Sequence, residues 1–416
     1  MNPTTDTAKP RALIIGGSMA GLFSALLLRN QGWRVDVYER SAEQLASRGA
    51  GIATHGPLVA ALQKAGVDPG DALGVPIMGR AVFDRDGSVA DTYDLPQVMT
   101  SWDLLFKLLR AGLPDAHYHV GVPLESVSQI ADTVTATFAD GRTETGDLLI
   151  AADGIQSTVR GQMLPDLHPK YAGYIAWRGM ADEADISQAT LDHLGERLGF
   201  CLPPGEHSLT YPVAGPNDEL TPGHRRRNWV WYRTAVSEAE QAALMTAQDG
   251  RRQEVSVPPH KVRAEAVAAM RRDARKFLAP QFVELLDNIA QPFLQAIVDL
   301  ESPQVVFGRV AVLGDAAFVA RPHTGMGVAK AGEDAVALAE VLRGNGRNSD
   351  GDIDQALTAW EIGRLAYGRS AVARGLRLGR MLSSDRTAAD GDTFGLGRGV
   401  HQAVMIETAV PGDIRA

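Results

Sequence analysis

The sequence predicts an α/β fold that begins with a parallel sheet, continues into a mixed sheet with helices and ends in a helical segment. Three observations lead to this prediction. A strand–turn–helix–strand pattern opens the chain, two short apolar runs typical of buried parallel strands follow much later, and stretches of alternating polarity lie between them. We expect the first domain to comprise 1–75, 100–170 and 301–345, the second domain 76–99 and 171–300, and the C-terminal helical segment 346–416.

The opening of the chain carries a βαβ pattern. Residues 11–16 (RALIIG) form an apolar run closed by glycine, which is typical of a buried strand. Residues 18–31 carry apolar side chains at helical spacing, and Gly32 is a typical helix end. Residues 34–39 (RVDVYE) alternate as a second strand, which implies a parallel sheet. Glycines interrupt the apolar run Ala12–Leu28, so we interpret it as part of this unit and not as a secretory signal.

The later elements follow from the same kinds of pattern. Residues 147–152 (DLLIAA) and 309–314 (RVAVLG) are apolar runs that suit buried strands. Residues 229–234 (WVWYRT) alternate as a strand of the mixed sheet, and residues 258–300 are predicted to be largely helical. A long helix is predicted from Gly327 to about Arg343, followed by a polar loop, one or two helices and a glycine-rich end.

Composition excludes several classes of function. The net charge of −9 and the pI of about 5.6 disfavour nucleic acid as a partner, because an acidic surface repels phosphates. The basic cluster Arg225–Arg227 is interpreted as solvated loop charge. The single cysteine, Cys201, fits a reducing cytoplasm and leaves any redox chemistry to a bound cofactor. No stretch approaches the roughly 20 apolar residues that span a bilayer, so we expect a cytoplasmic protein without a membrane partner.

The turn between the first strand and the first helix has the features of a phosphate-binding loop. Gly16 permits a tight turn, Gly21 lets the helix pack close to the sheet, and the small Ser18 replaces the middle glycine of a GxGxxG fingerprint. Met19 and Ala20 complete the start of the helix, whose free N–H groups and positive dipole end favour a pyrophosphate. A tight strand-to-helix turn without a ligand is the plainer interpretation.

The second strand ends in an acidic residue that strengthens the dinucleotide interpretation. Glu39, followed by Arg40, stands about 20 residues beyond the last glycine, which is the spacing of a carboxylate that accepts ribose hydroxyls. Strand, turn, helix, strand and acid occur together in the order that the motif requires. The sequence therefore predicts that this region binds a dinucleotide.

Several later segments form an ordered set of motifs. They are Ala151–Arg160 (AADGIQSTVR), Tyr171–Gly179 (YAGYIAWRG), Arg309–Ala317 (RVAVLGDAA), Arg321–Gly327 (RPHTGMG) and Glu333–Ala335 (EDA). They resemble the GADGxxSxVR segment, a segment of one branch, the GRVxLxGDAAH segment, the PxxGxG turn and the DAxxLAxxL helix of the FAD-dependent aromatic hydroxylases. These are single-component flavoprotein monooxygenases, and the matches follow the family's order.

The resemblance implies a Rossmann-like FAD-binding domain of the aromatic hydroxylase type, a mixed β-sheet substrate domain and a helical C-terminal segment. It implies FAD as the cofactor and NADH or NADPH as a transient co-substrate. Asp315 would accept hydroxyls of the flavin's ribityl chain, whereas Asp153 has turn capping as its structural alternative. The other residues implied to contact the cofactor are Gly51, Asp153, Gly154, Pro322, Gly325, Met326 and Gly327.

The resemblance also implies a reaction. NAD(P)H reduces FAD, O2 adds to give a flavin C4a-hydroperoxide, and one oxygen atom is transferred to a small electron-rich aromatic ring. Within the family the quoted segments most resemble the hydroxypyridine hydroxylases of aromatic catabolism, so we expect a hydroxypyridine as substrate. A hydroxybenzoate or purine substrate, or an oxygen-independent FAD oxidoreductase, stays open, as does the oligomeric state, a homodimer included.

A hydroxylated ring reacts faster with an electrophilic oxygen once it is deprotonated, so a base near neutral pH is expected in the site. His323, His55 and Tyr211 are the candidates, with helix capping and an ordinary buried hydrogen bond as the structural alternatives. Arg178 could hold an anionic substrate or form a structural ion pair. Other notable side chains are expected to be core residues, Trp177 and Trp231, or loop residues, His207 and His224.

Overall fold

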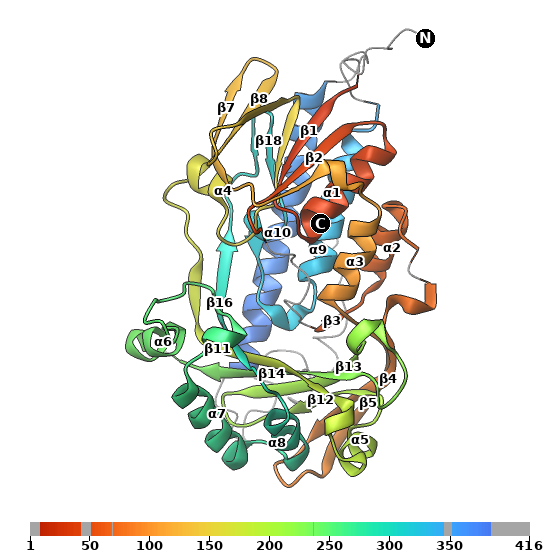
Figure 1. The fold of residues 1–416 in the computed structure, drawn as a ribbon, viewed down its shortest axis with the longest axis vertical. Coiled ribbons are helices and arrows are strands. Elements are labelled where there is room, and N and C mark those ends of the chain that lie inside the picture. The colour runs from red at the N-terminus through yellow and green to blue at the C-terminus, as the bar shows by residue number, and fades with distance from the viewer. Residues whose placement is uncertain (1–8, 43–50, 69, 236, 345–351, 384–416) are drawn as a thin grey trace.

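The computed structural model describes residues 9–42, 51–68, 70–235, 237–344 and 352–383. Two sheets dominate this part of the chain, one in the upper and one in the lower half of Figure 1. No helix in the described ranges is long and apolar enough to cross a bilayer.

The first sheet is largely parallel and has the order β17-β18-β10-β1-β2-β6. Its strands are β1 (Arg11–Ile15), β2 (Arg34–Glu39), β6 (Tyr118–Val120), β10 (Leu148–Ala151), β17 (Val306–Phe307) and β18 (Val310–Val312). Every pair is parallel except β17 with β18. β1 and β10 are almost wholly buried, as expected for apolar strands covered on both faces. The predicted strands at 11–16, 34–39, 147–152 and 309–314 are therefore confirmed, to within a residue or two at their ends.

Helices and a small antiparallel sheet complete the first half. The elements are α1 (Met19–Asn30), α2 (Gly56–Lys64), α3 (Trp102–Ala111), α4 (Thr158–Met163), α9 (Gly327–Val341), β7 (Leu124–Ile130), β8 (Thr133–Phe138) and β9 (Thr143–Gly146). Side chains from α1, α9, β8 and the parallel strands share one apolar core. The predicted helices at 18–31 and 327–343 are confirmed by α1 and α9.

The second sheet is mixed and follows the order β15-β16-β11-β14-β13-β12-β4-β5-β3, with β19 paired to β16 off this path. Its strands are β3 (Gly51–Ala53), β4 (Val75–Phe83), β5 (Val89–Ser101), β11 (Lys170–Asp182), β12 (Arg197–Cys201), β13 (His207–Val213), β14 (Arg226–Thr234), β15 (Ser256–Val257), β16 (Phe293–Glu301) and β19 (Phe318–Val319). The predicted strand at 229–234 is confirmed by β14. β3 joins this sheet although it lies within the segment 1–75 assigned to the first domain.

Helices cover the outer side of the second sheet (Figure 1). They are α5 (Gln188–Leu194), α6 (Glu238–Met245), α7 (Ala264–Phe277) and α8 (Pro280–Asp287). Trp177 and Trp231 are buried in the core beneath α7 and α8, which confirms their assignment as core residues. The prediction that 258–300 is largely helical is wrong for its last part, because β16 pairs there with both β11 and β15.

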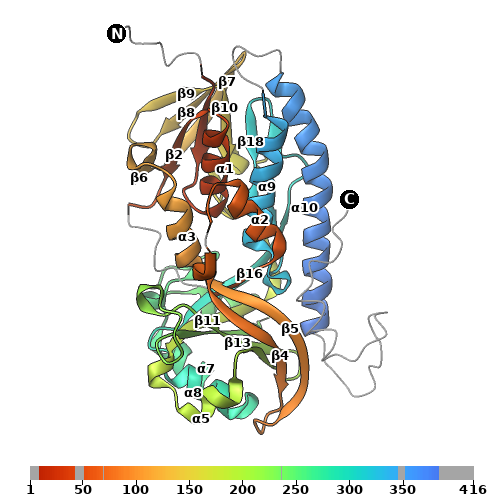
Figure 2. The ribbon, with the colours of Figure 1, turned by 90° about the vertical axis from the view of Figure 1, so that its right-hand side faces the viewer.

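One long helix and several short ones finish the fold. α10 (Ile353–Ser383) runs beside α9 and continues to the level of the second sheet (Figure 2). The glycine-rich end predicted after it lies outside the described residues. Short 3-10 turns occur at Gly70–Leu73, Asp115–His117, Glu183–Asp185, Pro216–Asp218, Pro259–Lys261, Gly314–Ala316 and Pro322–Thr324.

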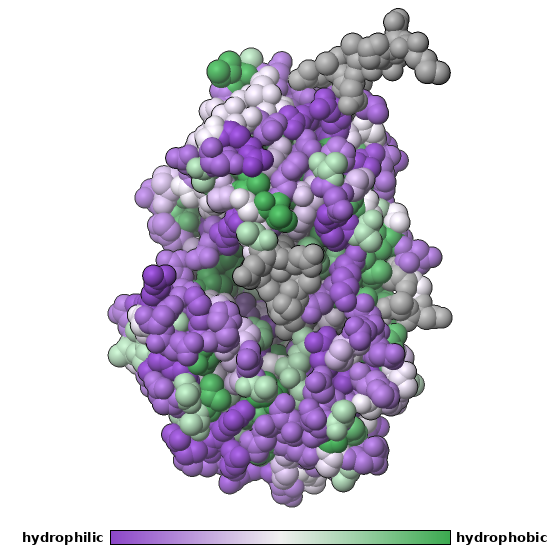
Figure 3. All heavy atoms as spheres, viewed as in Figure 1, coloured by the Kyte–Doolittle hydropathy of each residue, from purple (hydrophilic) through white to green (hydrophobic). Residues whose placement is uncertain are grey.

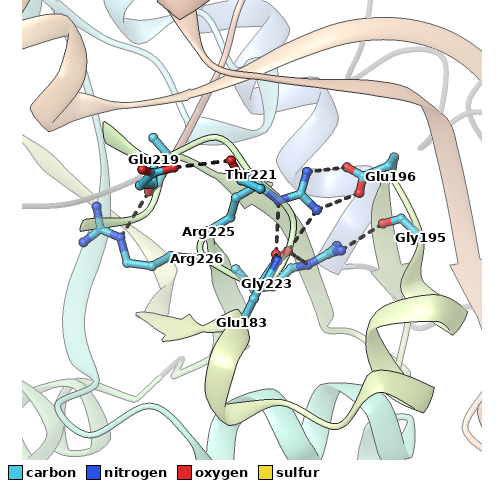
Figure 4. A network of polar contacts seen from close by, with 10 residues as sticks. Glu183, Gly195, Glu196, Glu219, Thr221, Gly223, Arg225 and Arg226 are labelled. Atoms are coloured by element: carbon cyan, nitrogen blue, oxygen red, sulfur yellow. Dashed lines mark hydrogen bonds and ion pairs between the residues drawn. The ribbon is translucent and has the colours of Figure 1, made fainter. Parts of the chain in front are cut away.

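Two of the three arginines in the cluster at 225–227 are buried, contrary to the prediction of solvated loop charge, and Arg226 is partly exposed. Arg225 and Arg227 are buried, and both donate to the carboxylate of the buried Glu183 (Figure 4). Arg225 also pairs with Glu196 at 2.6 Å. A buried guanidinium requires such partners, and here they fasten the start of β14 to the end of β11 and to the start of β12.

Candidate functional site

A cavity of about 530 Å³ lies where the two sheets face each other. We call one end of it the motif end, because the glycine turns and helix starts of the sequence motifs line it. We call the other the strand end, because side chains from β4, β11, β12, β13, β14 and β16 line it together with the Pro322–Gly325 turn. On the face drawn in Figure 3 the surface is hollowed between the upper and lower halves of the molecule.

The turn before α1 is built so tightly that only glycine fits. Gly16 has a φ of +105°, and a Cβ there would lie 2.3 Å from the carbonyl oxygen of Ala152. A Cβ on Gly21 would lie 1.9 Å from the carbonyl oxygen of Gly16. The two carboxylate oxygens of Glu39 accept the N–H groups of Gly17 and Ser41 at 2.9 Å each. Glu39 thus stabilises the turn through two hydrogen bonds to backbone N–H groups.

Two helices begin at the motif end, and both begin without a capping side chain. Ser18 precedes α1 and Met326 precedes α9, and neither helix has a side-chain cap or an acidic residue in its first turn. Their N–H groups and positive dipole ends therefore remain available to an anion in the cavity. This is the electrostatic setting that a pyrophosphate and an electron-rich ring system require.

Carboxylates and one arginine complete the motif end. Asp315 lies on the cavity wall after β18, where its oxygens can accept hydroxyl groups. Asp153 binds the first N–H groups of α4 with Oδ2, while its buried Oδ1 has no partner among the described residues. Arg160 donates to the carbonyl oxygens of Ala316 and Ile155, so it connects the motif Ala151–Arg160 to the motif Arg309–Ala317.

The strand end is lined by alternate residues of neighbouring strands. Successive side chains of a strand point to opposite faces, so His207 and Tyr211 of β13 share a face with Tyr232 of β14. Arg178 of β11 joins them, whereas the adjacent Trp177 points into the core on the other side. None of the described residues that line the strand end is acidic.

His323 is held in place by a chain of polar groups. Its Nε2 lies 2.6 Å from the hydroxyl of Tyr174, whose ring lies under the guanidinium of Arg321 at 5.4 Å. Arg321 in turn forms a bidentate ion pair with Asp299 of β16. Burial, then the charges of Arg321 and Arg178, lowers the pKa of His323 to about 3. Burial raises the pKa of Tyr174.

A second, water-sized cavity of about 10 Å³ lies behind this wall. His207, Tyr232 and His323 line both cavities, so two imidazoles and a phenol separate them. His207 stacks on Tyr232 at 4.4 Å, and its ring lies 4.9 Å from that of His323. The prediction that His207 lies in a loop is wrong, because it begins strand β13 and is buried.

His55 lies beside the cavity rather than in its lining. It precedes α2, its Nδ1 is 3.5 Å from Gln97, and it lies behind the left-handed Gly325, where a Cβ would come within 3.1 Å of its Nε2. Burial and the charge of Arg80 lower the pKa of His55 to about 4. This position suits support of the Gly325 turn better than contact with a ligand.

The structure gathers most of the predicted site residues around one cavity. The predicted residues that line it are Ser18, Met19, Ala20, Gly51, Gly154, Tyr211, Asp315, Pro322, His323, Gly325 and Gly327. Those outside the lining are Gly16, Gly21, Glu39, Arg40, His55, Asp153 and Met326. Sequence reasoning did not single out Arg80, Tyr174 and Tyr232. The signal for Tyr174 and Tyr232 was the alternation of polar side chains within β11 and β14, whereas Arg80 is a lone polar residue in the apolar strand β4 and gave none.

Comparison with known proteins places these features in context. The family described as FAD binding domain-like matches residues 171–299. The chain is 32% identical over 375 residues to 2,6-dihydroxypyridine 3-monooxygenase of Paenarthrobacter nicotinovorans, and the match covers 89% of this chain and 90% of the relative.

Solved structures agree with this match. The structure of 2,6-dihydroxypyridine-3-hydroxylase from Arthrobacter nicotinovorans superposes with a TM-score of 0.85 at 30% identity, over 92% of this chain and 95% of that one. A variant of Klebsiella pneumoniae HpxO complexed with FAD superposes with a TM-score of 0.72 at 26% identity, over 90% of both chains.

Proposed function

The chain belongs to the FAD-dependent aromatic hydroxylases, and we propose that the ring it hydroxylates is a pyridine already bearing hydroxyl groups. As a member of this family it is a monooxygenase that uses FAD, NAD(P)H and O2. The pyridine is supported by the match to a 2,6-dihydroxypyridine 3-monooxygenase over most of both chains. It is also supported by the polar side chains of the strand end, which include an arginine and two tyrosines and no acidic residue among those described.

The motif end fits FAD. Two uncapped helix starts face the cavity, and Asp315 offers acceptor oxygens on its wall. Ser18 and Met19 would hold the pyrophosphate, Asp315 the ribityl hydroxyls, and the start of α9 at Gly327 the flavin ring. When bound, FAD carries electrons from NAD(P)H to O2 and delivers one oxygen atom to the substrate.

Arg178 is the observation that carries the substrate proposal. Arg178 lines the strand end beside Tyr232, with which it shares a hydrogen bond, and no carboxylate among the described residues forms an ion pair with it. A cationic pocket without acidic side chains favours an anion. A dihydroxypyridine that has lost one proton supplies a single delocalised charge on a flat ring of suitable size, and Tyr211 and Tyr232 can bond its ring substituents.

His323 would act on the substrate's hydroxyl proton. To accept this proton at Nδ1, His323 carries its own proton on Nε2 and donates it to the hydroxyl oxygen of Tyr174, an arrangement that the 2.6 Å contact allows. Nδ1 is buried without a partner among the described residues. An anion bound beside Arg178 offsets the positive charges that depress the pKa of His323. Substrate binding would therefore make this imidazole a better proton acceptor.

The substrate proposal is tested with a panel of dihydroxypyridines, hydroxybenzoates and purines. Each is scored by stimulated NADH and NADPH oxidation, O2 consumption and product mass. We expect a dihydroxypyridine to give the largest stimulation, with a product heavier by one oxygen atom. Hydroxylation of benzoates or purines with no response to any pyridine would refute the substrate class. NADH oxidation without O2 consumption would instead refute transfer of oxygen to this substrate.

A further inference from the structure

A buried carboxylate lies behind the motif end, outside the cavity. Asp334 is in the middle of α9 and only 4% exposed. Its Oδ2 accepts the backbone N–H of Gly314 at 3.0 Å. Its Oδ1 accepts Nε and a terminal nitrogen of Arg364 at 2.9 and 2.5 Å. One buried acid therefore connects α9, α10 and the Gly314–Ala316 turn.

The Gly314–Ala316 turn is the one that presents Asp315 to the cavity. Gly314 has a φ of +64°, and a Cβ there would lie 2.9 Å from the Cβ of Ala20 in α1. The turn is thus confined by α1 on one side and bonded to Asp334 on the other. A small displacement of Gly314 would move the Asp315 carboxylate on the cavity wall, because the two residues are adjacent in a tight turn.

Helix α10 keeps Asp334 in this position. Arg364 holds the carboxylate through two nitrogens and lies over the ring of Tyr367 at 3.9 Å. Trp360 donates its indole N–H to the backbone oxygen of Asp334 at 3.2 Å. Lys330, one turn earlier on α9, lies 3.5 Å from the same carboxylate. Two cations thus contact one buried acid, and hydrogen bonds that involve ionised groups are stronger than those between neutral groups.

We propose that Asp334 is a positioning residue for FAD, which acts through the Gly314–Ala316 turn and depends on Arg364 of α10. The C-terminal helix thereby takes part in cofactor binding without touching the cofactor. The proposal requires only that the chain binds FAD, so it is independent of the identity of the aromatic substrate.

The test compares Asp334→Asn with a matched control on the same helix pair. Glu361 of α10 also accepts two backbone N–H groups with one carboxylate oxygen, those of Val305 and Val306 at 2.9 Å each, but it does not contact the Gly314–Ala316 turn. The full-length apoproteins are titrated with FAD, and flavin fluorescence gives the Kd. The Tm of each apoprotein is measured in parallel.

We expect Asp334→Asn to raise the Kd for FAD about tenfold or more, since a charge-assisted hydrogen bond is lost. Glu361→Gln should lower the Tm of the apoprotein about as much as Asp334→Asn does, but it should leave the Kd for FAD within about twofold of the value for the unchanged protein. The proposal is overturned if Asp334→Asn leaves the Kd unchanged. It is equally overturned if both variants raise the Kd in proportion to their loss of Tm.

A second variant covers the case in which Asp334→Asn does not fold. Arg364→Lys keeps the positive charge and removes the bidentate contact. We expect this variant to raise the Kd for FAD several-fold, and its effect should be less than additive with that of Asp334→Asn if the double variant folds. An unchanged Kd in Arg364→Lys contradicts the role assigned to α10.

Discussion

The two ends of the cavity are built by different means. Backbone builds the motif end: glycine turns, two uncapped helix starts and carboxylates that brace them. Side chains build the strand end, and they come from six strands distributed between Val75 and Glu301. The geometry of the motif end therefore depends on short backbone turns that tolerate few substitutions. The strand end depends on the register of the sheet, so its side chains can be replaced one at a time.

The largest effect is expected at the motif end from Gly21→Ala. The added Cβ would lie 1.9 Å from a backbone oxygen, which cannot move without opening the turn. We expect purified protein without bound flavin and a Kd for FAD raised at least 100-fold. Gly161→Ala in α4 is the control, because a Cβ there meets nothing within 4 Å. Normal flavin content in Gly21→Ala would contradict the tight fit.

At the strand end, Arg178→Ala should leave FAD binding intact and weaken the binding of the aromatic substrate. Removing the partner of a buried anion costs roughly 2–5 kcal/mol, which corresponds to a KM raised about 30-fold or more. Steady-state kinetics with the best substrate of the panel measure KM, and FAD titration is the control. A KM within twofold of the original value would show that Arg178 does not hold the substrate.

Tyr174→Phe should have a smaller effect, on turnover at the strand end and not on FAD binding at the motif end. It removes the hydroxyl that bonds Nε2 of His323, so we expect kcat to fall about tenfold and its pH profile to shift, with FAD binding unchanged. Tyr171→Phe in the same strand is the control, because that hydroxyl bonds only the backbone of Ala235 among the described residues. Equal effects of both changes would assign Tyr174 to packing alone.

A separate effect, on the stability of the fold and not on binding or catalysis, concerns the dependence of the unfolding free energy on pH. His55 and His323 have pKa values of about 4 and 3 in the folded protein, below the ordinary value of 6.5. Between the folded pKa values and 6.5, the unfolded chain therefore binds more protons than the folded protein. The free energy of unfolding consequently falls as the pH is lowered below 6.5. We expect each histidine to remove roughly 2 kcal/mol of unfolding free energy between pH 7 and pH 5.

His323→Gln should flatten this pH dependence. Urea denaturation of the apoprotein at pH 7 and pH 5 measures the difference in unfolding free energy for the original chain and the variant. His168→Gln is the control, because His168 lies outside the cavity lining on a loop before β11. An equally steep pH dependence in His323→Gln would contradict the assignment of a depressed pKa to this residue.

The sequence predicted the motif end well because its signals are local. The strand–turn–helix pattern around Gly16 and the apolar run before Asp315 each fit within one short window. At the strand end it singled out Tyr211, His323 and Arg178, which line the cavity, but it missed Arg80 and Tyr232, because the partners there are distant. β16 was assigned to a helix, since its apolar residues Ala296, Ile297 and Val298 are consecutive and its neighbouring strands are invisible locally. Arg225 was assigned to solvent for the same reason, because its partner Glu183 lies 42 residues away.

The pairing of β16 has a mechanical consequence. This strand is hydrogen-bonded to β11 and, at its C-terminal end, to β19, which follows the Gly314–Ala316 turn. Its Asp299 forms an ion pair with Arg321. β16 thus connects the sheet in the lower half of Figure 1 to the segment that follows the first sheet in the upper half. Because β19 follows the Gly314–Ala316 turn directly, a displacement of β16 would be passed on to the cavity wall that carries Asp315.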